Sequence, residues 1–140
     1  MAISREAHAE GDSTFAGNGT IDTSNLSALS AYGVGASAHA EGIGSFAKGG
    51  ASHAEGYKTQ ATGEASHAEG IETIADVQCA HAEGMYTEAN GISSHAEGHN
   101  TRTEGFYNHA EGTYTLATGY GAHAEGRGDI NKSVIASGQG

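Results

Sequence analysis

The stretch Ser66-His67-Ala68-Glu69-Gly70 decides the fold of this chain, because its last four residues recur throughout the sequence. The tetrapeptide His-Ala-Glu-Gly occurs eight times, and from His39 to His123 successive copies follow one another at 14 residues without exception. A fixed period of this kind indicates stacked structural units, each of which buries its inner face against its neighbours. We therefore take the 14-residue unit as the basic element of the protein.

Each unit contains two short segments in which residues alternate with a period of two. In the unit 53–66, the motif is followed by Thr59-Gln60-Ala61-Thr62-Gly63, whose first, third and fifth residues are small in most units. Such alternation predicts strands, and the intervening residues, which often include glycine, predict corners. Two strands of about five residues per unit predict an all-β fold, a parallel β-roll (β-solenoid) whose turns stack at ~4.8 Å.

Breaks in the period suggest how the chain is organised. Residues 1–7 form a short lead-in, and residues 8–140 form the β-roll repeat domain. The first two motif copies are 31 residues apart, which is two periods and three residues, so we expect a degenerate turn with an insertion near 22–31. A second insertion is expected near 127–133, and the last repeat is expected to be truncated at the C-terminus.

Composition indicates a narrow interior and argues against several classes of protein. Large apolar residues are few, with aromatics at 6%, so alanine, glycine, serine and threonine must fill the space between the strands. The net charge of −11 argues against nucleic acid as a partner. One cysteine cannot form an intrachain disulfide. No run is long and apolar enough to predict membrane insertion.

Strand parity predicts which side chains face inward. In the stretch quoted first, Ser66, Ala68 and Gly70 share one face, and His67 and Glu69 share the other. The small set is expected to face the interior, because the opposite strand is also small there. Histidine and glutamate then project outward.

The outward His and Glu do not vary over seven consecutive copies, whereas the outward position of the other strand does. That position holds Phe15, Phe46, Gln60, Ile74, Glu88, Arg102 and Leu116. An unchanging outward face implies a constraint, and contact with copies of the same chain in a rotationally symmetric oligomer would supply it. Corner residues such as Ile43, Tyr57, Ile71 and Met85, with Ile92, Phe106 and Tyr120 at the other corner, are expected to add apolar contacts between chains.

The expected interchain ladder runs along the oligomer axis. Its residues are His8, Glu10, His39, Glu41, His53, Glu55, His67, Glu69, His81, Glu83, His95, Glu97, His109, Glu111, His123 and Glu125. Buried carboxylates require partners, which neighbouring imidazoles would provide. If glutamate holds the histidines protonated, stability is lost as the pH rises; if they are buried and neutral, the sign reverses.

The repeat resembles the head domains of trimeric autotransporter adhesins of the YadA type. Those heads carry Ser-Val-Ala-Ile-Gly where this chain has Ser66-His67-Ala68-Glu69-Gly70. The resemblance covers roughly residues 8–140 and implies a left-handed parallel β-roll in a homotrimer, with the motif strands around the axis. Valine and isoleucine at the axis are replaced here by His and Glu, so the resemblance also implies a polar trimer axis. This variant also resembles repeats of phage and bacterial fibre proteins.

The function expected from these features is that of a structural or adhesive segment of a trimeric fibre, extracellular on a cell surface or virion. Its partner is itself, and a receptor or matrix protein of a host surface is a further partner that the sequence leaves open. The pattern His-x-Glu also occurs in zinc deaminases, but these need Pro-Cys-x-x-Cys, and this chain has no proline. We expect no enzymatic activity and no organic cofactor.

The alternative function is an ion-binding fibre module whose His/Glu rings hold ions on the axis, in place of a ladder with waters or small ions. Its candidate metal ligands are His39, His53, His67, His81, His95, His109 and His123.

Four remaining features are expected to be structural. Cys79 is expected to act as a small side chain on the axis side, with an interchain contact as the alternative. His99 lies outside the motif and is expected at a surface corner. The tripeptide 127–129 matches an integrin-type motif, which is common by chance. The repeated threonines would support ice binding only if they faced outward, and strand parity predicts that they face in.

Overall fold

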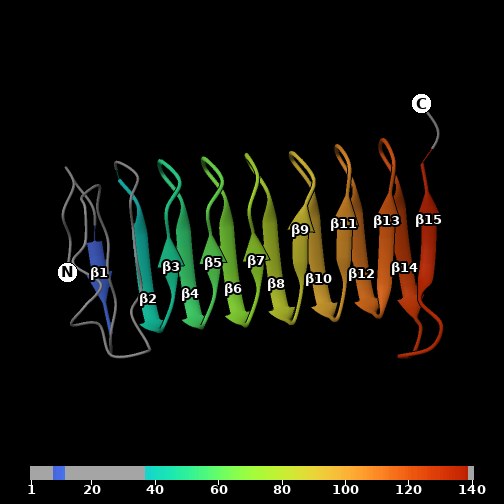
Figure 1. Cartoon of the computed structure of the whole chain (residues 1–140), viewed down its shortest axis with the longest axis horizontal. Helices are drawn as coiled ribbons and strands as arrows, with labels where there is room; N and C mark the ends of the chain where they lie inside the picture. The colour runs from blue at the N-terminus through green and yellow to red at the C-terminus, as the bar shows by residue number, and fades with distance from the viewer. Residues whose placement is uncertain (1–7, 12–36, 139–140) are drawn as a thin grey trace.

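The computed structural model describes residues 8–11 and 37–138, which coil around one long axis as a two-sheet β-solenoid (Figure 1). The described residues are all-β, and each turn contributes one strand to each sheet. This confirms the predicted all-β parallel solenoid of 14-residue, two-strand units. The described part of the chain holds no helix with the length and hydropathy to cross a membrane.

The first sheet, called the motif sheet below, contains every His-Ala-Glu-Gly copy. Its strands are β1 (His8–Glu10), β2 (His39–Ile43), β4 (His53–Tyr57), β6 (His67–Ile71), β8 (His81–Met85), β10 (His95–His99), β12 (His109–Thr113) and β14 (His123–Arg127). The opposite sheet contains β3 (Phe46–Ala47), β5 (Gln60–Ala61), β7 (Ile74–Ala75), β9 (Glu88–Asn90), β11 (Arg102–Glu104), β13 (Thr115–Thr118) and β15 (Val134–Ser137).

Neighbouring strands pair in parallel, with equivalent residues side by side. His67 of β6 pairs with His53 of β4 and with His81 of β8. Because the period of 14 residues equals one full turn, identical residues form straight rows along the molecule. The motif strands have five residues from β2 to β14, whereas the opposite strands have only two to four.

The short opposite strands depart from the two five-residue strands expected, and tight corners explain the difference. Each full unit has a corner residue in the left-handed conformation on either side of the motif strand. In the unit around β6 these are Ala65 and Glu72, with φ of 53° and 52°. Corners of adjacent turns are joined by backbone hydrogen bonds. The Ala65 amide donates to Gly50 O, and the Glu72 amide donates to Tyr57 O, both at 2.8 Å. The corners take up residues that would otherwise extend the opposite strand.

The interior is as narrow as the composition predicts. Among the described residues, every buried apolar side chain is an alanine, and the buried polar side chains are serines, threonines and Asn108. Ser66 and Ala68 face inward from the motif sheet, and Thr59 and Ala61 face them from the opposite sheet. The threonine row therefore faces in as predicted, which leaves no outward threonine array for ice binding at those positions.

Buried hydroxyl groups hydrogen-bond mainly within the corners and between turns. Ser66 Oγ donates to Gly63 O at 2.8 Å, and Thr59 Oγ1 donates to Ser45 Oγ one turn away at 2.9 Å. Asn108 replaces the corner serine in its turn, and its Oδ1 accepts a hydrogen bond of 2.8 Å from the Ala122 amide. These contacts satisfy the corner serines and Thr59, whereas the buried hydroxyl groups of Thr73, Thr87, Thr101 and Thr115 have no hydrogen-bond partner among the described residues.

The motif glycine has a role that strand parity does not predict. Gly70 has φ of 109°, and a Cβ atom there would lie 2.1 Å from the carbonyl oxygen of Gly84 in the next turn. Gly70 was expected to line the interior, but it lies half-buried on the outside of the roll. Glycine is required here because of backbone conformation and close stacking, whereas alanine fills the core.

Two departures from the period are visible in the strand register. Thr115 of β13 pairs with Val134 of β15, nineteen residues away, which is five more than one period. A tight turn lies in this segment, where the Asp129 and Lys132 amides and carbonyls bond each other. At the other end, His8 of β1 pairs directly with His39 of β2. The lead-in 1–7, the degenerate turn near 22–31 and the chain end at 139–140 lie outside the described residues.

Candidate functional site

The candidate site is the outward face of the motif sheet, where the histidines and glutamates of the motif form two parallel rows. We call these two rows the His/Glu seam. All the predicted ladder residues lie in it. From His39 to His109 the histidine side chains are 34–37% exposed, so each is already half-buried by its neighbours. At the end of the roll, His123 and Glu125 are more open, at 54% and 71%.

The imidazole rings form a continuous stack. From His39 to His109, consecutive rings have centroids 4.5–5.0 Å apart and planes within 4° of parallel. His123 continues the stack at 4.9 Å and 11°, and His8 joins it at 4.8 Å and 29°. The spacing equals the distance between hydrogen-bonded strands, so the sheet itself sets it.

From His39 to His123, each histidine Nε2 lies within 4.0 Å of a glutamate carboxylate oxygen. The Nε2–Oε distances within one turn run from 3.4 Å, for His53 and Glu55, to 4.0 Å, for His67 and Glu69. Buried Nε2 atoms without a hydrogen-bond partner occur in His39, His53, His67, His81, His95 and His109. An unpartnered buried polar atom is costly, so the seam of a single chain leaves a row of unmet hydrogen-bonding groups.

Two glutamates bridge adjacent turns. Glu69 places one oxygen 4.0 Å from His67 Nε2 and the other 4.0 Å from His81 Nε2. Glu97 does the same between His95, at 3.9 Å, and His109, at 3.8 Å. The seam thus has a two-turn pattern superimposed on its one-turn repeat.

The fold favours the neutral form of four seam histidines. Burial lowers the pKa of His67, His81 and His95, and the charge that the next histidine in the stack would carry lowers each pKa further. The pKa of His39 is lowered in the same way. Nearby glutamates act in the opposite direction but have the smaller effect. Stacked imidazolium ions would repel one another, which favours the neutral ring.

The carboxylates share protons along their row. Hydrogen bonds with Glu97 and Glu69, followed by burial and like charge, raise the pKa of Glu83 to about 7. The hydrogen bond with Glu97 is also the main cause that raises the pKa of Glu111. Conversely, the hydrogen bond that Glu83 donates lowers the pKa of Glu69 and of Glu97. The pKa of Glu83 is therefore above that of its two neighbours, so Glu83 keeps a proton in preference to Glu69 and Glu97.

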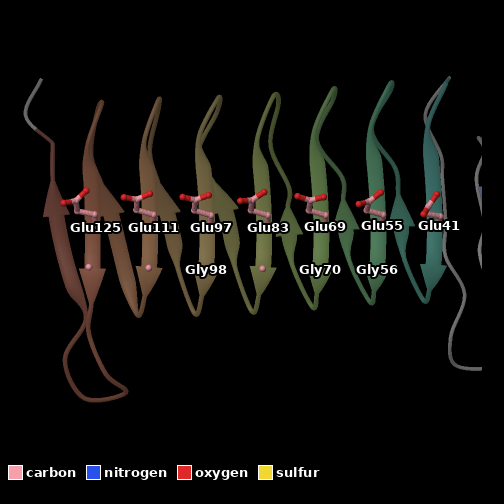
Figure 2. A pocket seen from close by; sticks show the side chains of 13 residues that line it. Glu41, Glu55, Gly56, Glu69, Gly70, Glu83, Glu97, Gly98, Glu111 and Glu125 are labelled. Atoms are coloured by element: carbon pink, nitrogen blue, oxygen red, sulfur yellow. The ribbon is translucent and has the colours of Figure 1, made fainter.

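A long open groove of about 1110 Å³ runs beside the glutamate row. Figure 2 shows the carboxylates in line above the motif glycines, which form the groove floor. The lining residues are Glu41, Glu55, Glu69, Glu83, Glu97, Glu111 and Glu125, with Gly56, Gly70, Gly84, Gly98, Gly112 and Gly126. Sequence reasoning missed this groove because it placed the glycines in the interior. The glycine backbone instead forms the floor of a groove on the outer face.

The seam also contains groups of potential metal ligands. Three-residue groups with donor atoms within 4.8 Å of one another are His39, Glu41 and His53; His53, Glu55 and His67; His81, Glu83 and His95; His95, Glu97 and His109; and Glu111, His123 and Glu125. Imidazole nitrogen and carboxylate oxygen together suit divalent transition metals.

Large apolar side chains flank the seam. Ile43, Tyr57, Ile71 and Met85 occupy the last position of consecutive motif strands and are 38–42% exposed. We call these four residues the apolar row. They were predicted to contact other chains, and the structure places them side by side in the sheet.

The remaining candidate residues lie apart from the seam. His99 continues the line of the apolar row, half-buried between Tyr86 and Tyr114 in edge-on ring contacts of 6.1 and 5.7 Å. Cys79 is an exposed thiol at a left-handed corner, a position where Tyr107 stands two turns later, so small size is not required there. Asp129 Oδ1 accepts hydrogen bonds from the Asn131 and Lys132 amides within its own turn.

Comparison of the chain with protein-family models, with curated protein sequences and with solved structures finds no match. Function must therefore be inferred from the geometry of the seam and its surroundings.

Proposed function

We propose that this chain is a non-enzymatic segment of a trimeric fibre, in which three left-handed β-rolls associate through the His/Glu seam. The fibre is exposed outside the cell or on a virion and acts as a rigid spacer, with adhesion to a host receptor or matrix protein as its further role. The resemblance to the heads of trimeric autotransporter adhesins supports the left-handed homotrimer.

The observation that carries the proposal is the separation of large and small apolar side chains. Within the described residues the buried apolar core consists of alanines alone, while the apolar row stands exposed beside the seam. An alanine core buries little surface per residue, and burial of apolar surface is the main favourable contribution to folding. Association through the seam would bury the apolar row and supply the burial that a single roll lacks.

The polar part of the seam supports the same arrangement. Its Nε2 atoms are buried and unpartnered in the single chain, and side chains of a second and third copy would bring hydrogen-bonding groups to them. A closed rotational assembly presents the same residue of each chain at the same height. This also explains why the motif repeats without change from His39 to His123.

Repetition also favours a structural role over catalysis. A catalytic site needs one arrangement of reactive groups in one place, whereas the seam offers the same His and Glu in every described motif strand from β1 to β14. Among the motif strands from β4 to β12, only β10 adds a second histidine, His99, and its ring packs between Tyr86 and Tyr114 apart from the seam.

Mass measurement in solution tests the proposal. Light scattering on the purified chain should give three times the chain mass of 14.1 kDa. Replacing Ile43, Ile71 and Met85 together by glutamine should convert the trimer to monomer or lower its melting temperature. The matched control replaces Phe46, Ile74 and Leu116, which point outward from the opposite sheet, by glutamine.

The control is informative because Gln60 occupies the same outward row naturally and pairs with both Phe46 and Ile74. It should leave the mass unchanged. A monomeric wild-type chain, or equal dissociation by both triple variants, would contradict the proposed interface.

A further inference from the structure

We propose that the His/Glu seam binds divalent transition-metal ions, each held within one turn by a histidine Nε2 and a glutamate oxygen of one protomer and by the equivalent histidines of the other protomers around the shared axis. The inference rests on the trimer proposed above. It assigns to the seam a ligand class, zinc, nickel or cobalt, and a role in which the ion links the chains.

The donor atoms are of the right type and are unoccupied by other contacts. Six Nε2 atoms of the seam are buried and make no hydrogen bond within the described residues, while a carboxylate oxygen lies within 4.0 Å of each of them. Metal ions bind neutral imidazole and ionised carboxylate, and together these ligands suit zinc and its neighbours in the first transition series.

The spacing of these two donors fits one ion. With metal–ligand bonds of about 2.0–2.1 Å in a tetrahedral site, two donor atoms lie about 3.3–3.4 Å apart. The Nε2–Oε distance is 3.4 Å between His53 and Glu55 and 3.5 Å between His39 and Glu41. The donor separation of these two pairs therefore matches that of two ligands on one ion.

A single chain cannot complete the site with a second histidine. His39 and His53 belong to one group of potential ligands, but their ring planes are 3° from parallel and their centroids are 4.6 Å apart. The Nε2 lone pair lies in the plane of its ring, so the lone pairs of stacked rings run parallel and do not converge on one point. The additional imidazoles must therefore come from the same turn of other chains, where the rings lie at the same height.

Charge along the seam favours bound cations and limits their number. The carboxylates of adjacent turns lie side by side, because Glu83 is the sheet partner of Glu69 and of Glu97, and a cation between them would offset their repulsion. Ions in successive turns would be about 4.8 Å apart and would repel each other strongly. We expect occupancy of about every second turn, and so fewer ions than turns.

The experiment uses the whole chain, freed of metal by EDTA and desalting. Zinc is titrated by calorimetry at pH 7.5, and the mass is measured by light scattering before and after. Zinc X-ray absorption on the loaded wild-type protein then identifies the ligands directly, whether or not any variant folds. We expect saturable binding by a trimer and the scattering signature of two or more imidazoles per ion.

A matched pair of variants locates the site. Replacing His67, His81 and His95 by glutamine removes three of the eight seam histidines and should lower the number of bound ions roughly in proportion. The His99→Gln variant removes the one histidine that lies outside the motif, packed against tyrosines, and should leave binding unchanged.

The experiment distinguishes failure of the metal site from failure of the proposed trimer. A trimer that gives no heat with millimolar zinc overturns the metal site and leaves the fibre proposal intact. A monomer overturns the shared ring, even if it binds zinc. An oxygen-only ligand shell, or loss of binding in His99→Gln but not in the triple variant, also overturns the assignment.

Discussion

The imidazole rings of His81 and His95 lie one above the other, with centroids 4.5 Å apart and planes 2° from parallel. These residues are 14 apart in sequence and are direct partners in the motif sheet. A shift of one residue in the pairing would turn every histidine of a strand to the other face, where the thin alanine interior has no room for it. The imidazole stack can therefore form only when all the motif strands pair in this register.

The motif glycine should tolerate no side chain. In Gly70→Ala, the new Cβ would meet the Gly84 carbonyl oxygen at 2.1 Å, at a φ of 109° that disfavours alanine. We expect a loss of stability of at least about 1–3 kcal/mol, the cost of a strained backbone position, measured by chemical denaturation. Gly50→Ala is the matched control, because nothing lies within 4 Å of the place that its new methyl group would take. Similar losses in both variants would contradict the backbone explanation.

The interior should reject larger apolar residues. Ala82 is fully buried between the two sheets, and Ala82→Leu would force them apart. We expect destabilisation of about 1–3 kcal/mol or more, typical of overpacked cores, seen as a lower midpoint in urea. Gln60→Leu adds an apolar side chain on the exposed outer face of β5 and should change the midpoint little. A neutral Ala82→Leu would mean that the interior is wider than the structure shows.

Stability should fall as the solution is acidified below neutrality. The pKa values of His39, His67, His81 and His95 are lowered in the fold from an ordinary value of 6.5. The unfolded chain therefore binds more protons, so the stability from these groups is complete above about pH 6.5 and is lost as the pH falls through the folded pKa values. Melting curves in EDTA between pH 7.5 and pH 5 should show a falling melting temperature. A rise towards pH 5 that persists in Glu83→Gln, which lacks the carboxyl group with a pKa of about 7, would mean that the histidines are held protonated.

Glu83 should act in the opposite direction at higher pH. Its pKa is raised from 4.5 to about 7, so it favours the fold at low pH, and that contribution is lost as the pH rises through 7. Glu83→Gln keeps the side-chain shape without the charge. We expect a gain at pH 8 of about 1 kcal/mol after allowance for solvent screening, and a smaller effect at pH 5.

The control for that charge effect is Glu64→Gln, which alters an exposed corner glutamate away from the seam. Urea midpoints at pH 5 and pH 8 for both variants give the comparison. An equal gain in stability in Glu64→Gln would mean that the lower net charge, and not the raised pKa of Glu83, causes the effect.

Much of the fold could be predicted from the sequence because one period governs it. The 14-residue repeat predicts parallel strands in register, and strand parity predicts that Ala68 faces inward while His67 and Glu69 face outward. Both follow from the two-residue period of a strand, which needs no knowledge of distant contacts. The short opposite strands could not be predicted, because they depend on left-handed corners at residues such as Ala65 that have no special preference for that conformation.

The sequence by itself therefore determined the solenoid, its thin interior and the line of histidine and glutamate on one face. The contacts that these residues make between turns were decided by the tertiary structure alone. Stacking at the strand spacing brings the carboxyl group of Glu83 within reach of Glu69 and Glu97, so that protons are shared between turns. Close contact between Gly70 and Gly84 turns a residue expected inside into the floor of an outer groove. These properties arise between turns, where distance and backbone conformation decide which groups meet.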